Sequence, residues 1–366
     1  MRNYDALLLV SFGGPEKPSD VIPFLENVTR GRGIPKERLE AVAEHYYHFG
    51  GKSPINDENR ALIALLAQDL ESHGVDLPIY FGNRNWAPLL SDTVAEMTRA
   101  GVKNALALIT SAYSSYSSCR QYLGDIEAAR AANPGAPEIE PLRRFFNHPG
   151  FLDACTARVG AARAELEAVI GSNVTKARLV YTAHSIPKAM ADRCDYEKQL
   201  SANAALISER LGHAHWDLVW QSRSGAPEVP WLEPDILDHL RVLAREGTAG
   251  VVIAPIGFLC DHVEVLYDLD YEARLLCEEL KLPMARAATV GTHPDFVACL
   301  RELVLERIAG TAPASVGPFP ARPFPCAPDC CPRPMPPVRL GTPAGSRPET
   351  ATAPLRASEE ARKPER

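Results

Sequence analysis

Short apolar runs alternate with longer amphipathic stretches along most of the chain. The short runs are bounded by turn residues and predict strands at Ala6–Ser11, Leu77–Gly82, Ala105–Ser111, Arg178–His184, Asp217–Gln221 and Gly250–Pro255. The longer stretches have the helical period and predict helices at Asn56–Ser72, Ser118–Ala132, Phe151–Ile170, Asp192–Leu211, Pro234–Glu246 and His262–Leu280. This alternation is typical of βα units around parallel sheets, and two doubly wound α/β halves fit the number of elements.

Doubly wound sheets bind their ligands at the carboxyl ends of the strands. The residues that follow the predicted strands are therefore the first candidates for a functional site. They come directly after Ser11, Gly82, Ser111, Tyr181, Gln221 and Pro255.

Composition narrows the class of protein. The chain has 366 residues and a net charge of −7, so we expect no nucleic-acid partner. The first apolar run is too short for a signal peptide, and the longest run, residues 250–260, is interrupted by Pro255 and Gly257 and is too short to span a membrane. We therefore expect a cytoplasmic protein without an integral membrane segment. Its nine cysteines, an odd number, favour free thiols or metal ligands over a disulfide framework.

The C-terminal segment differs from the rest of the chain. From Pro313 onward, 14 of 54 residues are proline and the periodicity ends, which predicts that residues 313–366 are largely disordered. This segment nevertheless begins with Cys326, Cys330 and Cys331, which a plain linker would not need.

An acidic segment follows the last predicted strand. Glu264, Asp268 and Glu272 are spaced i, i+4 and i+8, so a helix would place their carboxylates along one face, beside His262. Such a stripe is often an ordinary solvated helix face. Its position at the carboxyl end of a strand favours a route for hard divalent cations or protons, because carboxylate oxygens suit both.

Two further loops follow apolar strands. His184 ends its strand, so its imidazole is expected at the edge of the sheet, although a lone histidine is more often structural. Near the N-terminus, Phe12-Gly13-Gly14-Pro15 lacks the spacing of a dinucleotide-binding loop. Its glycines instead allow the backbone to approach a flat ligand closely.

Together these segments resemble the signature motifs of the ferrochelatase family, in the family's usual order over about residues 4 to 310. The motifs are Phe12-Gly13-Gly14-Pro15, Gly50-Gly51-Lys52-Ser53-Pro54, Ala183-His184-Ser185-Ile186-Pro187, Gln221-Ser222-Arg223 with Pro230-Trp231-Leu232, and Asp261-His262-Val263-Glu264. The resemblance implies two similar Rossmann-like α/β domains, each with a parallel four-stranded sheet flanked by helices, and a porphyrin cleft between them. The first domain would comprise residues 1–145 and 286–312, and the second residues 146–285.

The resemblance also implies an activity. The protein would be a lyase that inserts Fe²⁺ into a porphyrin and releases two protons. His184 and Glu264 would be the catalytic pair, facing each other across the macrocycle from opposite walls of the cleft, and would bind the incoming Fe²⁺. His262, Asp268 and Glu272 would relay protons and metal. No organic cofactor is implied.

Several residues are implied on the substrate side. Ser53 and Tyr122 match family positions that contact the porphyrin carboxylates, and hydroxyls are suitable donors for these groups. Arg30 and Arg32 either pair with further carboxylates or are solvated loop charges. Phe12 occupies a position where some bacterial relatives have a tyrosine that ligates the product iron, which phenylalanine cannot do.

Phe12 and the cysteines resemble the actinobacterial subset of the family. That subset acts on coproporphyrin III in haem biosynthesis, so coproporphyrin III and Fe²⁺ are the expected substrates, and the product would pass by transient contact to a downstream decarboxylase. Many members hold a [2Fe–2S] cluster, whose ligands here would be Cys155, Cys326, Cys330 and Cys331. A zinc site or an empty thiol site is the alternative, because the Cys-x₃-Cys-Cys spacing is tighter than is usual for the subset.

Other functions remain possible on the sequence alone. A protoporphyrin IX ferrochelatase would share every motif, and a cobalt or nickel chelatase would share the fold. A non-catalytic haem carrier would need an axial ligand but no proton relay, so Asp268 and Glu272 distinguish it from an enzyme.

Overall fold

The first half of the chain is built on a four-stranded parallel sheet. The computed structural model describes residues 3–31, 33–225, 228–327 and 329–333. The sheet contains β1 (Ala6–Ser11), β2 (Ile79–Asn83), β3 (Asn104–Ile109) and β4 (Glu138–Pro141), in the order β2-β1-β3-β4. All six residues of β1 are buried, as expected for a strand covered on both faces.

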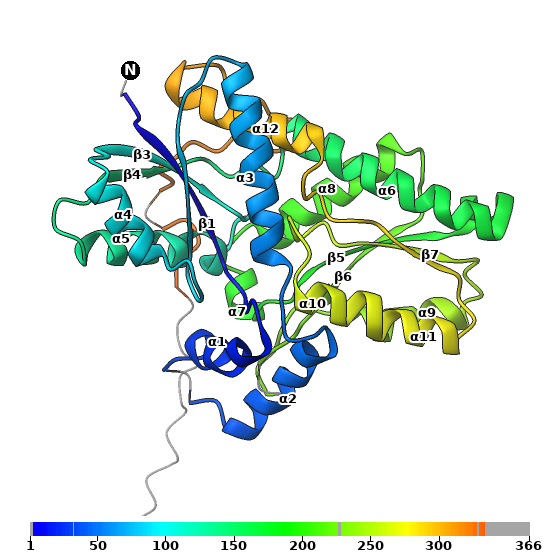
Figure 1. Cartoon of the computed structure of the whole chain (residues 1–366). Coiled ribbons are helices and arrows are strands. Elements are labelled where there is room, and N and C mark those ends of the chain that lie inside the picture. Colours follow the sequence, from blue (N-terminus) through cyan, green and yellow to red (C-terminus); the bar gives the residue numbers. More distant parts are fainter. Residues whose placement is uncertain (1–2, 32, 226–227, 328, 334–366) are drawn as a thin grey trace, which may run out of the picture. The chain divides into compact units, whose positions relative to one another are not determined.

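The second half repeats this arrangement. Its sheet contains β5 (Arg178–His184), β6 (Trp216–Gln221), β7 (Val251–Ala254) and β8 (Met284–Arg286), in the order β6-β5-β7-β8, and all neighbouring strands are parallel (Figure 1). Each sheet places its first strand between its second and third strands. The predicted class, two doubly wound halves with four-stranded parallel sheets, is confirmed.

Helices connect the strands of both sheets. In the first half they are α1 (Val21–Val28), α2 (Lys36–His48), α3 (Ile55–Ser72), α4 (Leu90–Arg99) and α5 (Gln121–Ala131), with short 3₁₀ and π turns at Pro18–Asp20 and Tyr116–Arg120. The remaining helices are α6 (Pro149–Ile170), α7 (Lys188–Ala191), α8 (Tyr196–Arg210), α9 (Ile236–Arg245), α10 (Val263–Val265), α11 (Arg274–Glu279) and α12 (Pro294–Ile308). A 3₁₀ turn covers Gly171–Lys176, and the π-helical segment η4 (Leu266–Ala273) joins α10 to α11.

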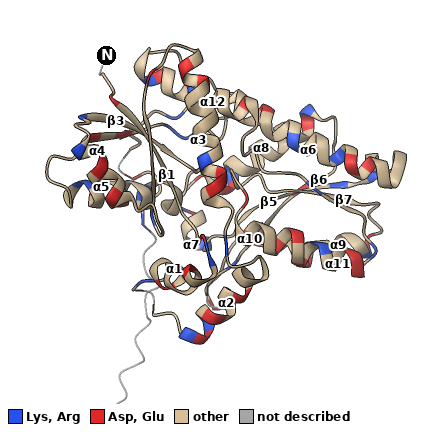
Figure 2. Cartoon of the chain, viewed as in Figure 1, with Lys and Arg blue, Asp and Glu red and all other residues tan. Residues whose placement is uncertain are grey.

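One apolar core joins the two halves. It includes Leu9 of the first sheet, Tyr181 of the second, and the aromatic cluster of Phe145, Phe151 and Phe296. Helix α12 packs on both α3 and α6, so the last helix covers elements from both halves (Figure 1). Because this core is continuous, the two sheet edges that carry candidate residues are held in one body. On the exposed helices, such as α2, α6 and α11, acidic and basic residues are interspersed (Figure 2).

The six predicted strands are all present, and β1 and β5 have the predicted bounds. The strands β4 and β8 were not predicted. β8 has three residues and β4 contains Pro141, so neither has a sustained apolar run. The stretch predicted as one helix over Asp192–Leu211 forms α8 from Tyr196, after the separate short helix α7.

The part of the C-terminal segment that the structure describes lies against the body. The Val316 N–H donates to the Asn147 carbonyl at 2.9 Å, and the Asn147 side chain donates to the Phe319 carbonyl at 2.7 Å. Arg322 forms an ion pair with Asp195 of the second half. The prediction of disorder for residues 334–366 lies outside the described residues.

Candidate active site

His184 and Glu264 lie next to each other in the second half, although 80 residues separate them in the sequence. The expectation that they face each other across the macrocycle is wrong, because the gap between them is too narrow for a ring. His184 is the last residue of β5, and Glu264 is the second residue of α10. His184 Nε2 lies 3.7 Å from Glu264 Oε2. His184 Nδ1 lies 2.5 Å from the Ser185 carbonyl oxygen, which can only accept a hydrogen bond. This contact assigns the proton of the neutral ring to Nδ1, which leaves Nε2, the nitrogen nearer to Glu264, with its lone pair. Both side chains are partly exposed, so a substrate can reach them.

His262 lies beside this pair and starts α10 as its N-cap residue. Its ring packs edge-on against Phe258, with the ring centroids 5.1 Å apart. Burial lowers the pKa of His262, Glu264 opposes this effect, and His184 adds to it. His262 is therefore a neutral imidazole near pH 7 that can accept a proton from its neighbours.

The carboxylates of Glu264, Asp268 and Glu272 form an interacting series. Asp268 accepts hydrogen bonds from the hydroxyl of Ser222 and from Gln221 Nε2, the latter at 3.2 Å. Burial raises the pKa of Asp268 to about 7, and the charges of Glu264 and Glu272 also raise it. Burial likewise raises the pKa of Glu272. Asp268 thus exchanges its proton near neutral pH, as a relay between two carboxylates requires.

The backbone of this series differs from the predicted α-helix. Residues 266–273 form a π helix, a geometry found mostly as short insertions at functional sites. Helix α2 covers it, because the rings of His45 and Tyr267 stack with centroids 3.7 Å apart, and His48 contacts Tyr271 at 4.2 Å. The first half therefore packs directly on the segment that carries the acidic residues.

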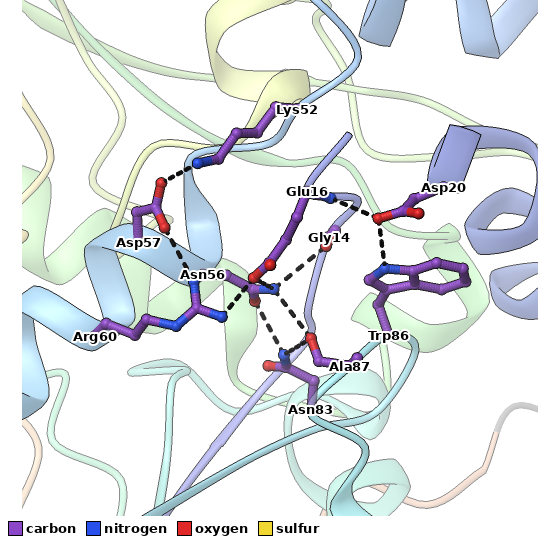
Figure 3. Close-up of polar contacts among 10 residues, drawn as sticks. All are labelled: Gly14, Glu16, Asp20, Lys52, Asn56, Asp57, Arg60, Asn83, Trp86 and Ala87. Atoms are coloured by element: carbon purple, nitrogen blue, oxygen red, sulfur yellow. Dashed lines mark hydrogen bonds and ion pairs between the residues drawn. The ribbon is translucent and has the colours of Figure 1, made fainter. Parts of the chain in front are cut away.

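In the first half, the buried side-chain amides of two asparagines hold the loop of residues 12–15, called the glycine loop here, in place (Figure 3). The Asn56 amide donates to the carbonyl oxygens of Gly14 at 3.4 Å and Ala87 at 3.1 Å, and to Glu16 Oε1 at 2.9 Å. Asn83 donates to Asn56 Oδ1 at 3.0 Å. Both asparagines are 0% exposed, so these hydrogen bonds fix the loop without competition from water.

The predicted substrate residues occupy different positions around this loop. Ser53 and Tyr122 are only 2% and 6% exposed, whereas Phe12 is 39% exposed at the end of β1. The Ser53 N–H donates to the Pro15 carbonyl at 2.8 Å, which joins the Gly50–Pro54 motif to the glycine loop. Gly14 permits this packing, because a Cβ there would lie 2.7 Å from the Cβ of Ser53. Arg30 is exposed beyond the end of α1, and Arg32 lies outside the described residues.

The structure adds Arg84, which sequence reasoning missed although it comes just after the second predicted strand. Its guanidinium lies 4.5 Å from the ring centroid of Tyr122 and 6.0 Å from that of Phe12. Its Nε is 2.5 Å from Asp125 Oδ2. Arg84 thus places a largely buried positive charge between two predicted substrate residues.

The structure brings Cys119, and not Cys155, to the cysteines of the C-terminal segment. Cys119, Cys326 and Cys330 line one cavity, and the Sγ atoms of Cys330 and Cys331 are 3.7 Å apart. A hydrogen bond with the Cys331 thiol and the guanidinium of Arg144 hold the pKa of Cys119 well below its usual range.

Cys155 instead lies in another cavity, with Val159 and Ile256, and burial raises the pKa of its thiol to about 12. The predicted ligand set is therefore not assembled. The physical reason is the path of the chain: the Arg120 side chain binds the carbonyl oxygens of Cys330 at 3.0 Å and Ala327 at 2.6 Å, which keeps this segment beside Cys119.

Two features are absent from the described ranges. No group of three or more His, Cys, Asp or Glu side chains there could hold a metal ion as it stands. No helix among these residues is both long and apolar enough to cross a membrane.

Comparisons with known proteins identify the family of the chain. The family model described as Ferrochelatase matches residues 4–308. A coproporphyrin III ferrochelatase of Nocardia farcinica is 53% identical over 86% of this chain and 92% of the relative. One of Streptomyces coelicolor is 51% identical over 90% of this chain and 93% of the relative. A ferrochelatase of Rhodopirellula baltica is 50% identical over 93% of this chain and 97% of the relative.

A solved structure supports the fold. SirB from Bacillus subtilis, determined with Fe³⁺, matches with a TM-score of 0.50 at 14% identity, covering 83% of this chain and 95% of SirB. At that identity the likeness concerns the fold alone.

Proposed function

The chain belongs to the ferrochelatase family, and on this premise we propose that it inserts Fe²⁺ into coproporphyrin III, releases two protons and supplies iron coproporphyrin III for haem biosynthesis. It is thus a metal-inserting lyase. The observation that carries the mechanism is the adjacent pair of His184 Nε2 and Glu264 Oε2, 3.7 Å apart. This separation is longer than a hydrogen bond, so the two groups do not bond each other directly, and an incoming cation or a pyrrole N–H can approach either one.

His184 is the first proton acceptor in this proposal. Its Nδ1 proton is held by the Ser185 carbonyl, so the Nε2 lone pair is available to a pyrrole N–H or to Fe²⁺. Glu264 balances the charge as the proton or metal passes between them. Protons then leave by Asp268 and Glu272, and His262 is a second neutral base at the start of this path.

The first half binds the porphyrin in this proposal. Phe12 supplies an exposed ring for the flat face of the macrocycle. Arg30, Arg32, Ser53 and Tyr122 are the candidates for its carboxylates, and the buried Ser53 and Tyr122 would have to become accessible to bind them. The actinobacterial relatives are named coproporphyrin III ferrochelatases, which supports coproporphyrin III over protoporphyrin IX as the substrate. We place the reaction in the cytoplasm, with the product passing to a decarboxylase by transient contact.

A two-porphyrin assay tests the proposal. The purified chain receives Fe²⁺ with either coproporphyrin III or protoporphyrin IX under anaerobic conditions, and the loss of free-base absorption is followed. We expect faster insertion into coproporphyrin III. Equal or reversed rates would exclude the substrate assignment, and binding of iron porphyrin without any insertion would favour a carrier.

The [2Fe–2S] cluster belongs to this proposal with a changed ligand set, in which Cys119 replaces Cys155. The support is the chemistry of the donors, because four thiols with two nearby arginines suit an anionic iron–sulfur group. The thiols would have to move closer together, since they do not form a metal-binding group as they stand. No step of metal insertion depends on this cluster.

Two matched cysteine variants test this ligand set. Iron, acid-labile sulfide and visible absorption are measured in the purified wild type, in Cys119→Ser and in Cys155→Ser. The changed set predicts that the cluster signals are lost in Cys119→Ser and kept in Cys155→Ser. The opposite pattern restores Cys155 as the ligand, and a wild type without sulfide rules out the cluster.

A further inference from the structure

Arg286 is a largely buried cation that neither the sequence motifs nor the proposed reaction uses. It ends β8, the edge strand of the second sheet, and its side chain is 11% exposed. Its guanidinium lies between two carboxylates of one chain segment, those of Asp261 and Asp270.

All five N–H donors of this guanidinium have acceptors. Nε and one terminal nitrogen donate to the two oxygens of Asp270, at 3.0 and 2.7 Å. Asp261 receives the second bidentate contact, at 3.2 and 2.9 Å, and the fifth donor reaches the carbonyl oxygen of Ala287 at 3.3 Å. A planar fork that holds two carboxylates fixes their distance and their relative orientation.

The two carboxylates stand on either side of the residues proposed to move protons and metal. Asp261 directly precedes His262 and lies three positions before Glu264. Asp270 lies two positions after Asp268, inside the π-helical segment. One side chain therefore holds a ten-residue segment, residues 261–270, at both ends.

The first half also contacts Asp261. Glu58 of α3 accepts a hydrogen bond from the Asp261 N–H at 3.0 Å. Glu58 follows Ser53 by five residues, so this contact connects the porphyrin side of the proposed site to the segment that carries Glu264. Asp261 is thus held through its carboxylate by Arg286 and through its backbone by the first half.

We propose that Arg286 is a positioning residue for metal insertion: by joining Asp261 to Asp270 it sets the place of Glu264 relative to His184. This inference rests on the proposed function. Lysine keeps the positive charge but has no planar fork, so it cannot hold two carboxylates in two bidentate contacts. A small displacement of a reacting group lowers the rate while leaving the binding of the rest of the substrate intact.

Steady-state kinetics of Arg286→Lys test the inference. Fe²⁺ and coproporphyrin III are the substrates, and the porphyrin Kd is measured separately by fluorescence titration without metal. We expect kcat to fall by roughly 10- to 100-fold, with a higher KM for Fe²⁺. The porphyrin Kd should stay within about threefold, because the contacts of Arg286 go to Asp261, Asp270 and Ala287, none of which is proposed to bind the porphyrin.

Arg274→Met is the matched control. Arg274 also faces Asp270, but at 3.7 Å and with 46% of its side chain exposed, so its loss should change kcat by less than about twofold. Asp270→Asn is a second test that keeps Arg286 in place. It removes one carboxylate of the fork and should lower kcat with the porphyrin Kd unchanged, which decides the question if Arg286→Lys does not fold.

The outcomes separate the inference from the proposed function. A wild type that inserts no metal overturns the proposed function and this inference with it. An active wild type with folded Arg286→Lys at full kcat overturns the inference alone. A loss of porphyrin affinity in proportion to kcat also overturns it, because that pattern indicates a general structural role.

Discussion

The two halves of the chain share one sheet topology but differ in the chemistry at the carboxyl ends of their strands. The strand orders β2-β1-β3-β4 and β6-β5-β7-β8 correspond strand for strand. At equivalent places, β1 leads into the glycine loop after Phe12, whereas β5 ends at His184. After the second strand of each sheet, the first half has Arg84 beside aromatic rings, and the second half has Ser222 bound to Asp268.

The difference concerns how each half holds its site. The first half uses buried amides, Asn56 and Asn83, which keep one charge state at any pH. The second half uses carboxylates, and burial raises the pKa of both Asp268 and Glu272. A neutral framework suits the binding of a flat ligand, whereas carboxyl groups with raised pKa values, about 7 for Asp268, suit proton transfer. The comparison therefore supports the proposal that the first half binds the porphyrin and the second half carries out the chemistry.

Replacing His184 with alanine should give the largest effect. The substitution removes the proposed proton acceptor, so kcat should fall by about 10²- to 10⁴-fold. The porphyrin Kd should change by less than about threefold, because the first half supplies the binding surface. Anaerobic insertion assays and fluorescence titration measure the two quantities. His239→Ala is the control, since His239 pairs with Asp217 near the amino end of β6, whereas His184 lies at the carboxyl end of β5. Full activity of His184→Ala would contradict the proposal that the second half carries out the chemistry.

Asp268→Asn should give the next largest effect and a change in pH dependence. Asp268 accepts a relayed proton only when ionised, so the wild-type rate should rise with pH through about 7. The amide of the variant cannot titrate, so this rise with pH should disappear. At pH values above 7 the rate of the variant should be about tenfold lower than that of the wild type.

The pH–rate profile of insertion measures both effects. Asp238→Asn is the control, because Asp238 is exposed and pairs only with Arg241 among the contacts described. If the rate of Asp268→Asn still rises near pH 7, another group causes the rise. That result would weaken the proposed difference between the two halves.

Much of the fold could be predicted because its signals are local. Buried parallel strands such as Ala6–Ser11 and Arg178–His184 are continuous apolar runs, and their bounds could be read directly from the sequence. The strand Met284–Arg286 could not be recognised, because it has three residues and gains its stability by pairing with β7. The π-helical turn over residues 266–273 also has no local signal, since the same side-chain pattern fits an α-helix.

The residues of the candidate site also fall into those that the sequence could predict and those that it could not. His184 and Glu264 could be proposed because each follows an apolar strand, and the structure brings them within 3.7 Å. Arg286 could not be proposed, because its acceptors lie 16 and 25 residues away and only the fold brings them together. Cys119 was missed for a related reason: the contacts of Arg120 determine where the C-terminal segment runs. The roles of the individual site residues remain predictions.

Asn56→Ala should give the smallest effect on rate, and it tests the first half directly. The amide donates to three acceptors around the glycine loop, and its removal leaves buried groups such as the Asn83 amide with fewer partners. The free energy of unfolding should fall by about 1–3 kcal/mol. The looser loop should raise the KM for the porphyrin by roughly threefold to tenfold while kcat stays the same, because uniform binding is lost and the reacting groups are untouched.

Chemical denaturation and insertion kinetics measure these effects, with Asn133→Ala as the control. Asn133 also donates two hydrogen bonds to carbonyl oxygens, those of Ser91 and Ala129, but it lies at the end of α5, away from the glycine loop. It should therefore lose less stability and keep its KM. If Asn56→Ala instead lowers kcat at an unchanged KM, the buried amides take part in the chemical step. The assignment of binding to one half and chemistry to the other would then be wrong.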